Sequence, residues 1–318
     1  MKQNMKNAVH IEGLVYQHDL KKKVSGPNSK NPNTPFINGT IDIATDDALT
    51  NIVQIHYSYV TPTTKKGNSN PTYELLNNIV EGVVGSVMAH GADKAGKVRI
   101  DTAIGVNDFY TDRNGKSELV SAKRNEGGFI HMATADMNAD EKARNTFECD
   151  IVLTNVIDVD ANEEANTEAH VILRGFVFGF GNALVPVDFI ANNPVAMDYF
   201  RNLEATPNTP VFTRVRGRQI SQTIVTKTVE ESAFGEPSIK EVRKNRKAHV
   251  VFWAQSEPYL WDDESTITAK DLTDLKAARD LHLATVKKNQ EEYAANKGNA
   301  IPAASAAVAA AAKAGFNF

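Results

Sequence analysis

Cysteine is almost absent from this chain, and long apolar runs are absent altogether. The one cysteine among 318 residues is Cys149, which excludes an intramolecular disulfide and is typical of a reducing, cytoplasmic setting. No run of about 18 apolar residues occurs, so no membrane-spanning segment is expected. Met1 to Lys6 is polar, whereas a secretory signal requires an apolar stretch there. We therefore expect a cytoplasmic protein with no membrane partner, in which Cys149 is a small core residue.

The chain also lacks the motifs of common enzyme classes. It contains no P-loop, no G-x-S-x-G and no Cys/His spacing suited to a metal. Gly175 to Gly181 is glycine-rich, but no Lys-Ser or Lys-Thr follows it, and its glycines favour a bulge or a curved strand. Asp158 to Glu164 is acidic but lacks the glycine and the spacing of a calcium loop. These absences predict a protein that is not an enzyme and has no metal and no cofactor.

Neither sign of charge dominates. The chain has 35 Lys and Arg and 39 Asp and Glu, which gives a formal net charge of −4. General nucleic-acid binders are often basic, yet segregated charges can create a local positive field on an acidic protein. Basic residues gather at Lys21–Lys23, Lys65–Lys66, Arg214–Arg218 and Lys240–Lys247, and acidic ones at Asp158–Glu168 and Asp262–Glu264. Any single basic run is more simply read as a solvated loop. Several runs, however, fall at equivalent places in a repeat.

That repeat is one order of strands and helices that occurs twice. Alternating apolar residues predict three strands, then a helix that begins at an Asn-Pro pair, then two more strands. In the first half the strands are Val9–Tyr16, Phe36–Ile43, Ile52–Val60, Val98–Val106 and Gly128–Met132, with the helix at Asn70-Pro71. In the second half they begin at Phe147 and continue at Val171–Phe178, Leu184–Ile190, Pro210–Arg218 and Ala248–Trp253, with the helix at Asn193-Pro194.

Five strands with a helix between the third and the fourth is the order of an OB-fold, a small barrel suited to unpaired nucleic acid. We therefore predict a mostly-β protein of two tandem OB-like five-stranded barrels. The first barrel is expected over residues 1–135, a linker over 136–145 and the second barrel over 146–258. A C-terminal helix over 259–297, with Leu272, Leu275, Leu283 and Val286 on one face, precedes an Ala-rich tail over 298–318.

Val211 to Ile220, then a long basic hairpin and a return through Lys247 to Phe252, resembles the bacterial and phage single-stranded DNA-binding protein family. In that family a V-x-G-R-x strand with such a hairpin forms the wall against which DNA lies. The first half is similar in order, so the resemblance covers most of residues 9–255. It implies an OB-fold and single-stranded DNA as the partner.

The chain departs from that family at two points. Family chains commonly end in an acidic, aromatic-tipped tail that recruits replication proteins, and here Phe316 and Phe318 lack neighbouring acids. They also commonly carry one OB unit, whereas this chain supplies two. Two units with a C-terminal extension resemble a phage or mobile-element version, located in the host cytoplasm if phage-encoded.

Unpaired DNA requires a positive groove and aromatic faces on which bases stack, each stack contributing about 1–3 kcal/mol. Tyr57 and Tyr59 share one strand face and form either a stacking pair or a core pair. Arg214, Arg216 and Arg218 alternate along one strand, which packing explains poorly. Trp253 is a stacking candidate or, with Tyr259 and Trp261, a seat for the C-terminal helix. The predicted nucleic-acid-binding set is Tyr57, Tyr59, Phe109, Tyr110, Lys21, Lys22, Lys65, Lys66, Arg214, Arg216, Arg218, Lys244, Arg246 and Trp253.

The expected function is sequence-nonspecific binding of single-stranded DNA in replication or recombination. The alternative is a virion structural or assembly protein built on small barrels, which would show an apolar patch where a binding protein gathers Arg and aromatic residues. The tail, through Phe316 and Phe318, is expected either to contact replication proteins or another copy of the chain, or to pack internally as an Ala-rich helix.

Overall fold

The computed structural model of the chain describes residues 5–113, 116–133, 136–162, 167–230, 238–261 and 267–296. Side chains at positions 112–116, 222–246 and 294–296 are not described. The predicted tail, with Phe316 and Phe318, lies outside these residues.

The strands are β1 (Asn7–His18), β2 (Lys21–Val24), β3 (Pro35–Ala44), β4 (Ile52–Val60), β5 (Lys97–Arg113), β6 (Lys116–Met132), β7 (Asn145–Val159), β8 (His170–Phe178), β9 (Leu184–Ala191), β10 (Val211–Glu230) and β11 (Ser238–Ala254). The helices are α1 (Pro71–Val80), α2 (Val87–His90), α3 (Pro194–Asn202) and α4 (Ala269–Asn296), with short 3-10 turns η1 (Glu141–Ala143) and η2 (Phe180–Asn182).

The first half of the chain closes into a five-stranded barrel, which we call barrel 1. β1 pairs with β3 and β5, β3 with β4, and β5 with β6, all antiparallel. β4 and β6 close the ring as a parallel pair. This order, with α1 between the third and fourth barrel strands, is that of an OB-fold. The lysines at 21–23, predicted as part of a loop, instead form β2 on the edge of β3.

The second half repeats the arrangement as barrel 2. β7 pairs with β8 and β10, β8 with β9, and β10 with β11, all antiparallel, and β9 closes on β11 as a parallel pair. α3 stands between its third and fourth strands. The prediction of two OB-like barrels in a mostly-β chain is therefore confirmed. Both barrels have apolar interiors, with side chains such as Ile11, Ile55, Phe147 and Phe189 fully buried, and Cys149 is buried as expected.

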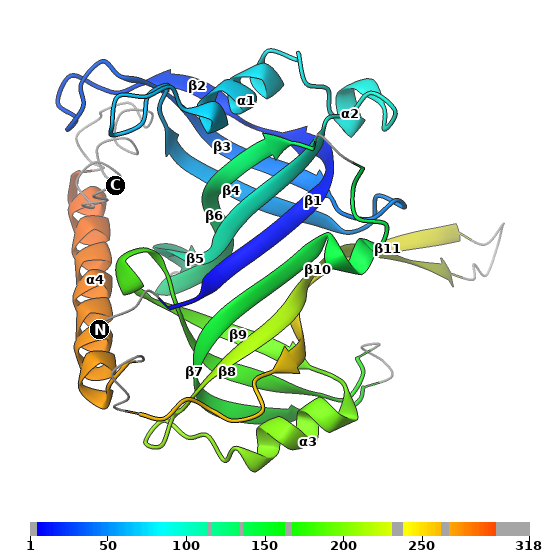
Figure 1. Cartoon of the computed structure of the whole chain (residues 1–318), viewed down its shortest axis with the longest axis vertical. Helices are drawn as coiled ribbons and strands as arrows, with labels where there is room; N and C mark the ends of the chain where they lie inside the picture. Colours follow the sequence, from blue (N-terminus) through cyan, green and yellow to red (C-terminus); the bar gives the residue numbers. More distant parts are fainter. Residues whose placement is uncertain are drawn as a thin grey trace.

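The barrels are joined through their first strands. β1 and β7 pair antiparallel, with Val9 opposite Phe147, so the described strands form a single eleven-stranded sheet. Figure 1 shows one barrel above the other, with α1 and α2 at the top and α3 at the bottom. The connection between the barrels is pinned to barrel 1, because the buried Arg144 donates to the Asn138 carbonyl and to Asp47 Oδ1 at 2.6 Å.

Both short helices begin as the Asn-Pro pairs predict. Asn70 Oδ1 accepts from the Thr72 amide at 3.2 Å, and Asn193 Oδ1 accepts from the Val195 amide at 2.9 Å. Such caps typically contribute about 1 kcal/mol, and proline at the first helical position loses no hydrogen bond.

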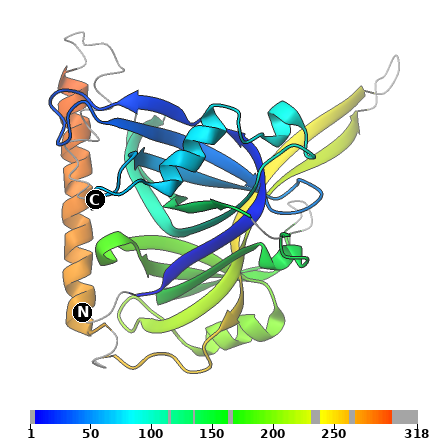
Figure 2. The ribbon, with the colours of Figure 1, turned by 45° about the horizontal axis from the view of Figure 1, so that its top comes forward.

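The C-terminal helix α4 lies along the side of both barrels (Figures 1 and 2). The predicted face is confirmed, since Leu272 is buried and Leu275, Leu283 and Val286 are half-buried. Its beginning packs in a small apolar cluster with Ile267, Phe212 and Trp261. Trp261 and Tyr259 thus seat this helix, whereas Trp253 is not part of that cluster.

Candidate nucleic-acid interface

The base of the β10–β11 hairpin carries two arginine–aromatic pairs whose rings are exposed. The guanidinium of Arg216 lies 4.5 Å from the centre of the Trp253 ring, and that of Arg218 lies 5.2 Å from the centre of Phe252. Trp253 is 41% exposed and Phe252 is 49% exposed. Arginine above an aromatic face combines a phosphate-binding cation with a surface on which a base can stack.

Phe252 was not in the predicted set, because adjacent strand residues normally point to opposite faces. A β-bulge breaks that rule here. Arg216 is opposite Trp253 and Gly217 is opposite Val251, so Phe252 is the extra residue. Both rings are exposed at the bulge. Glycine is required at position 217, since a Cβ there would lie 2.3 Å from the Phe147 ring. No sequence signal short of the strand register reveals this bulge.

The predicted arginine row is corrected at Arg214. Its guanidinium forms a two-armed ion pair with Asp150, at 2.7 Å from Nε and 3.1 Å from Nη2, and the Asp150 side chain is only 4% exposed. Barrel 1 has a matching pair, Arg99 with the buried Glu12 at 3.1 Å, also between its fourth and first strands. The repetition indicates that Arg214 holds two strands together. Arg216 is 51% exposed and touches Glu148 at 3.2 Å.

Beyond its base the hairpin continues as a long two-stranded ribbon that projects from barrel 2 (Figure 1). β10 and β11 stay in register from Gly217 opposite Val251 to Glu230 opposite Ser238. Lys244 and Arg246 lie on this ribbon, opposite Ile224 and Gln222. Their side chains lie outside the described part, so their predicted role in binding remains a prediction.

Of the two tyrosines of β4, Tyr57 is corrected, whereas the binding role of Tyr59 stays a prediction. Tyr57 is 1% exposed and lies in the core of barrel 1, where its ring cannot meet a base; burial raises the pKa of its hydroxyl. Tyr59 is half-buried with its ring centre 4.6 Å from that of Phe36. The apolar rings fill the interior because the alternation in β4 places Gln54 and Ser58 on the outside.

The predicted lysines of barrel 1 are all exposed. Lys21 and Lys22 lie on β2, where Lys22 forms an ion pair with Glu81 of the α1 C-cap. Lys65 and Lys66 lie in the loop between β4 and α1. β2 borders β3, so Lys21 and Lys22 stand at the edge of the second and third strands of the barrel, the surface on which OB-folds bind oligonucleotides.

Phe109 and Tyr110 lie on the β5–β6 hairpin, which carries neither the arginine–aromatic pairs nor the predicted lysines of barrel 1. Phe109 is 39% exposed and Tyr110 is half-buried. The neighbouring Asp108 is bound by Arg279 of α4 at 2.9 Å. These two aromatics therefore sit beside an acidic, helix-bound position.

A sequence model of the YorF family matches residues 6–289, most of the chain. The chain belongs to the YorF family. None of the curated proteins compared with this YorF-family chain matches it in sequence.

Among solved structures, the YorF-family chain is similar to the single-stranded DNA-binding protein of Thermus aquaticus, in its wild-type form and in a deletion mutant. Both are 9% identical to it, with a TM-score of 0.41. The similarity covers 83% of this chain and 98% of the mutant or 99% of the wild type.

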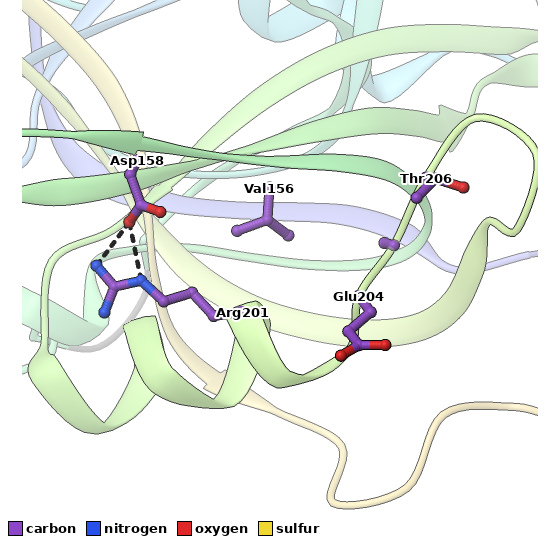
Figure 3. Close-up of a pocket in the computed structure, with 6 residues that line it drawn as sticks. Val156, Asp158, Arg201, Glu204 and Thr206 are labelled. Atoms are coloured by element: carbon purple, nitrogen blue, oxygen red, sulfur yellow. Dashed lines mark hydrogen bonds and ion pairs between the residues drawn. The ribbon is translucent and has the colours of Figure 1, made fainter.

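A shallow pocket of about 410 Å³ lies beside α3 of the YorF-family chain, and none of the residues that line it belongs to the arginine–aromatic pairs. Figure 3 shows Arg201 of α3 turned toward Asp158 of β7, with Glu204 and Thr206 across from them. Arg201 Nη2 lies 2.6 Å from Asp158 Oδ1 and Nη1 lies 2.9 Å from Asp198. The only basic residue of its lining is thus paired with carboxylates, which makes the pocket a poor place for a phosphate.

Across the described segments, no group of three or more His, Cys, Asp or Glu side chains is arranged to hold a metal ion. Of the helices within those segments, none is both long and apolar enough to cross a membrane.

Proposed function

We propose that this chain binds single-stranded DNA with little sequence preference, through the exposed face of the β10–β11 hairpin. The observation that carries the proposal is the pairing of Arg216 with Trp253 and of Arg218 with Phe252 on one exposed surface. Stacking tolerates any base, because each base has a flat π-face, and it contributes about 1–3 kcal/mol per base.

The charge of the hairpin supports the same function. Five of the eight residues from Lys240 to Lys247 are basic and one is acidic. Binding Lys and Arg to phosphates releases condensed counterions, so affinity falls with salt at a slope of about −0.7 per contacted phosphate on a single strand. The net charge of −4 does not oppose this, because field strength near a ligand depends on local charge.

The alternative of a virion assembly protein is less well supported by this surface. An assembly contact calls for a continuous apolar patch, whereas the two exposed rings here each carry a guanidinium. We further propose that the protein acts on unpaired strands during replication or recombination, in the cytoplasm and in a phage or mobile-element setting. The free, buried Cys149 supports a cytoplasmic setting, and the presence of two barrels with a C-terminal helix in one chain supports a phage or mobile-element setting.

The decisive test is a fluorescence titration with oligo-dT at two salt concentrations. The chain has two tryptophans, and only Trp253 lies at the proposed surface, so stacking should quench its emission. Trp261→Phe should retain the quenching and Trp253→Phe should lose it.

Arg216→Ala with Arg218→Ala should weaken binding by about tenfold or more and reduce the salt slope. Equal affinity for duplex DNA, or binding indifferent to salt, would refute the proposal.

A further inference from the structure

The two barrels have opposite charges at equivalent places. The connection between the first two barrel strands is basic in barrel 1, where residues 19–34 contain four lysines and one aspartate. In barrel 2 the same connection, residues 160–169, contains four acidic residues and no Lys or Arg. This connection and the neighbouring second and third strands are a usual oligonucleotide-binding surface of an OB-fold. Only barrel 1 has the charge that such a surface requires.

The strand surface of barrel 2 is also neutralised and partly engaged. Arg174 on β8 forms a two-armed pair with Asp188 on β9, with Nε at 2.9 Å and Nη2 at 3.3 Å. Barrel 1 reaches this surface through Lys123 of β6, whose ammonium donates to the Asp188 carbonyl at 3.1 Å. A phosphate there would have to compete with a carboxylate for the arginine.

The hairpin between the fourth and fifth barrel strands shows the opposite difference, because here barrel 2 has the element suited to binding DNA and barrel 1 does not. In barrel 1 the β5–β6 hairpin is fastened to α4. The Asp108 carboxylate, 1% exposed, lies 2.9 Å from Arg279 and 3.3 Å from His282, and Ser121 donates to it at 2.5 Å. In barrel 2 the β10–β11 hairpin is the basic ribbon that projects away from the barrels in both views (Figures 1 and 2).

The exposed aromatics on the fifth strands show the same division. Phe129 on β6 is opposite Asp101, and Trp253 on β11 is opposite Arg216. Phe129 is 68% exposed, but the Asp101 carboxylate opposite it is held by His10 at 2.8 Å. An aromatic ring beside a carboxylate is a poor platform for a polyanion, whereas a ring beneath a guanidinium is a good one.

The elements that carry the two favourable surfaces, β4 and β10, meet where the barrels touch. Gln219, near the base of the β10–β11 hairpin, exchanges two side-chain hydrogen bonds with Asn125 of barrel 1, at 2.8 and 2.9 Å. Asn51, directly before β4, accepts from the Ser221 amide at 2.7 Å. β4 then runs nine residues, about 30 Å, toward the end of the barrel where β3 is bordered by β2 and its lysines.

We propose that each chain carries one composite site for a single DNA strand, formed by the β2–β3–β4 surface of barrel 1 and the base of the β10–β11 hairpin of barrel 2, where Arg216 and Arg218 lie beside Trp253 and Phe252. The inference rests on the proposed function and adds its stoichiometry and path. Each barrel retains one of the two binding elements of an OB-fold, and the other element has become part of the scaffold. Two barrels therefore give one site.

The test combines native mass spectrometry with titrations of the full chain, using an oligo-dT of about 12 nucleotides, a length that one OB-fold can cover. We expect one oligonucleotide per chain. Lys21→Glu with Lys23→Glu, in barrel 1, and Arg216→Ala with Arg218→Ala, in barrel 2, should each weaken that one binding event by about tenfold or more. Arg174→Gln, on the strand surface of barrel 2, is the matched control and should bind as the unmodified chain does.

Two oligonucleotides per chain would overturn the composite site. So would a lysine variant that keeps full affinity, or an Arg174→Gln variant that loses as much affinity as the other two. If the unmodified chain binds no oligonucleotide at low salt, the proposed function itself fails, and this outcome is distinct from binding with the wrong stoichiometry. Circular dichroism of each variant verifies that loss of binding is not loss of fold.

Discussion

Arg214 and Arg216 lie two residues apart on β10 and contribute differently to the fold. The Arg214 guanidinium neutralises Asp150, whose side chain is 4% exposed, whereas Arg216 is 51% exposed and meets a partly exposed Glu148. Removing one partner of a buried charged hydrogen bond costs much more than removing an exposed ion pair. The row of three arginines thus contains a structural residue, Arg214, and an exposed one, Arg216, while Arg218 is half-buried.

We predict that Arg214→Gln lowers the free energy of unfolding by about 1–3 kcal/mol, because it leaves the Asp150 carboxylate without its cation. Arg216→Gln should lower it by less than about 1 kcal/mol. Urea denaturation of the two variants measures both effects. Equal losses would show that the burial of Asp150 does not decide the stability of this strand pair.

His249 on β11 is a second residue whose setting has a measurable consequence. Its ring centre lies 5.5 Å from that of Phe147 and 5.6 Å from that of Phe189. Burial, aided by the nearby positive charge of Lys123, lowers the pKa of His249 to about 3. The folded state therefore keeps this imidazole neutral, while the unfolded chain protonates it below about pH 6.5.

The sign of the resulting pH dependence follows from linkage. Between the folded and unfolded pKa values the unfolded state binds more protons, so the stability due to His249 is present above about pH 6.5 and is lost as the pH falls toward 3. We predict that the stability difference between the unmodified chain and His249→Gln narrows from about pH 7 to about pH 5, by up to about 1.4 kcal/mol per pH unit. Urea midpoints at several pH values measure it, and a constant difference would contradict it.

At the scale of elements, α4 is fastened to the β5–β6 hairpin by a buried ion pair. Asp108 is 1% exposed and Arg279 is 12% exposed, with 2.9 Å between Nη2 and Oδ1. Arg279 also donates to the Leu184 carbonyl of barrel 2 at 3.2 Å. One helix residue therefore contacts both barrels.

We predict that Arg279→Ala destabilises the chain by about 1–3 kcal/mol and speeds amide hydrogen exchange along α4, because the buried Asp108 carboxylate loses its guanidinium and keeps only Ser121 and His282. Lys270→Ala is the matched control on the same helix, since Lys270 is 83% exposed and pairs only within one turn with Asp274. That change should leave the urea midpoint almost unchanged, because an exposed ion pair contributes little to stability. If both variants unfold at the same urea concentration, α4 is not held by this pair.

The barrel strands and the two helices that begin at Asn-Pro could be predicted from the sequence, because strand alternation and the caps are local signals, whereas β2, with three consecutive lysines, shows no alternation. The parallel closures of β4 on β6 and β9 on β11 follow from the strand order of an OB-fold once it is recognised. The exposure of both Phe252 and Trp253 could not be predicted, because it depends on a bulge set by the partner strand. The burial of Tyr57 could have been predicted, because Tyr57 shares a strand face with Val53 and Ile55 while the polar Gln54 and Ser58 lie on the other face.

At the scale of the whole molecule, contacts between the barrels decide what each hairpin can do. The β1–β7 pairing brings the barrels together, and the Asn125–Gln219 pair holds the base of the β10–β11 hairpin against barrel 1. Both side chains are buried, at 6% and 7% exposure. They are 94 residues apart in the sequence, so no local sequence pattern predicts this contact.

This pair gives a prediction for the joining of the barrels. Asn125→Ala and Gln219→Ala should each destabilise the chain by about 1–3 kcal/mol, because each leaves the other amide buried without its partner. Asn125→Leu combined with Gln219→Leu removes both polar groups and should cost less than the sum of the two single leucine variants, a coupling of about 0.5–3 kcal/mol. A double-mutant cycle in urea measures that coupling. Additive losses would mean that water replaces the missing amides, and the base of the hairpin would then be held by strand pairing and the Asn51 contacts alone.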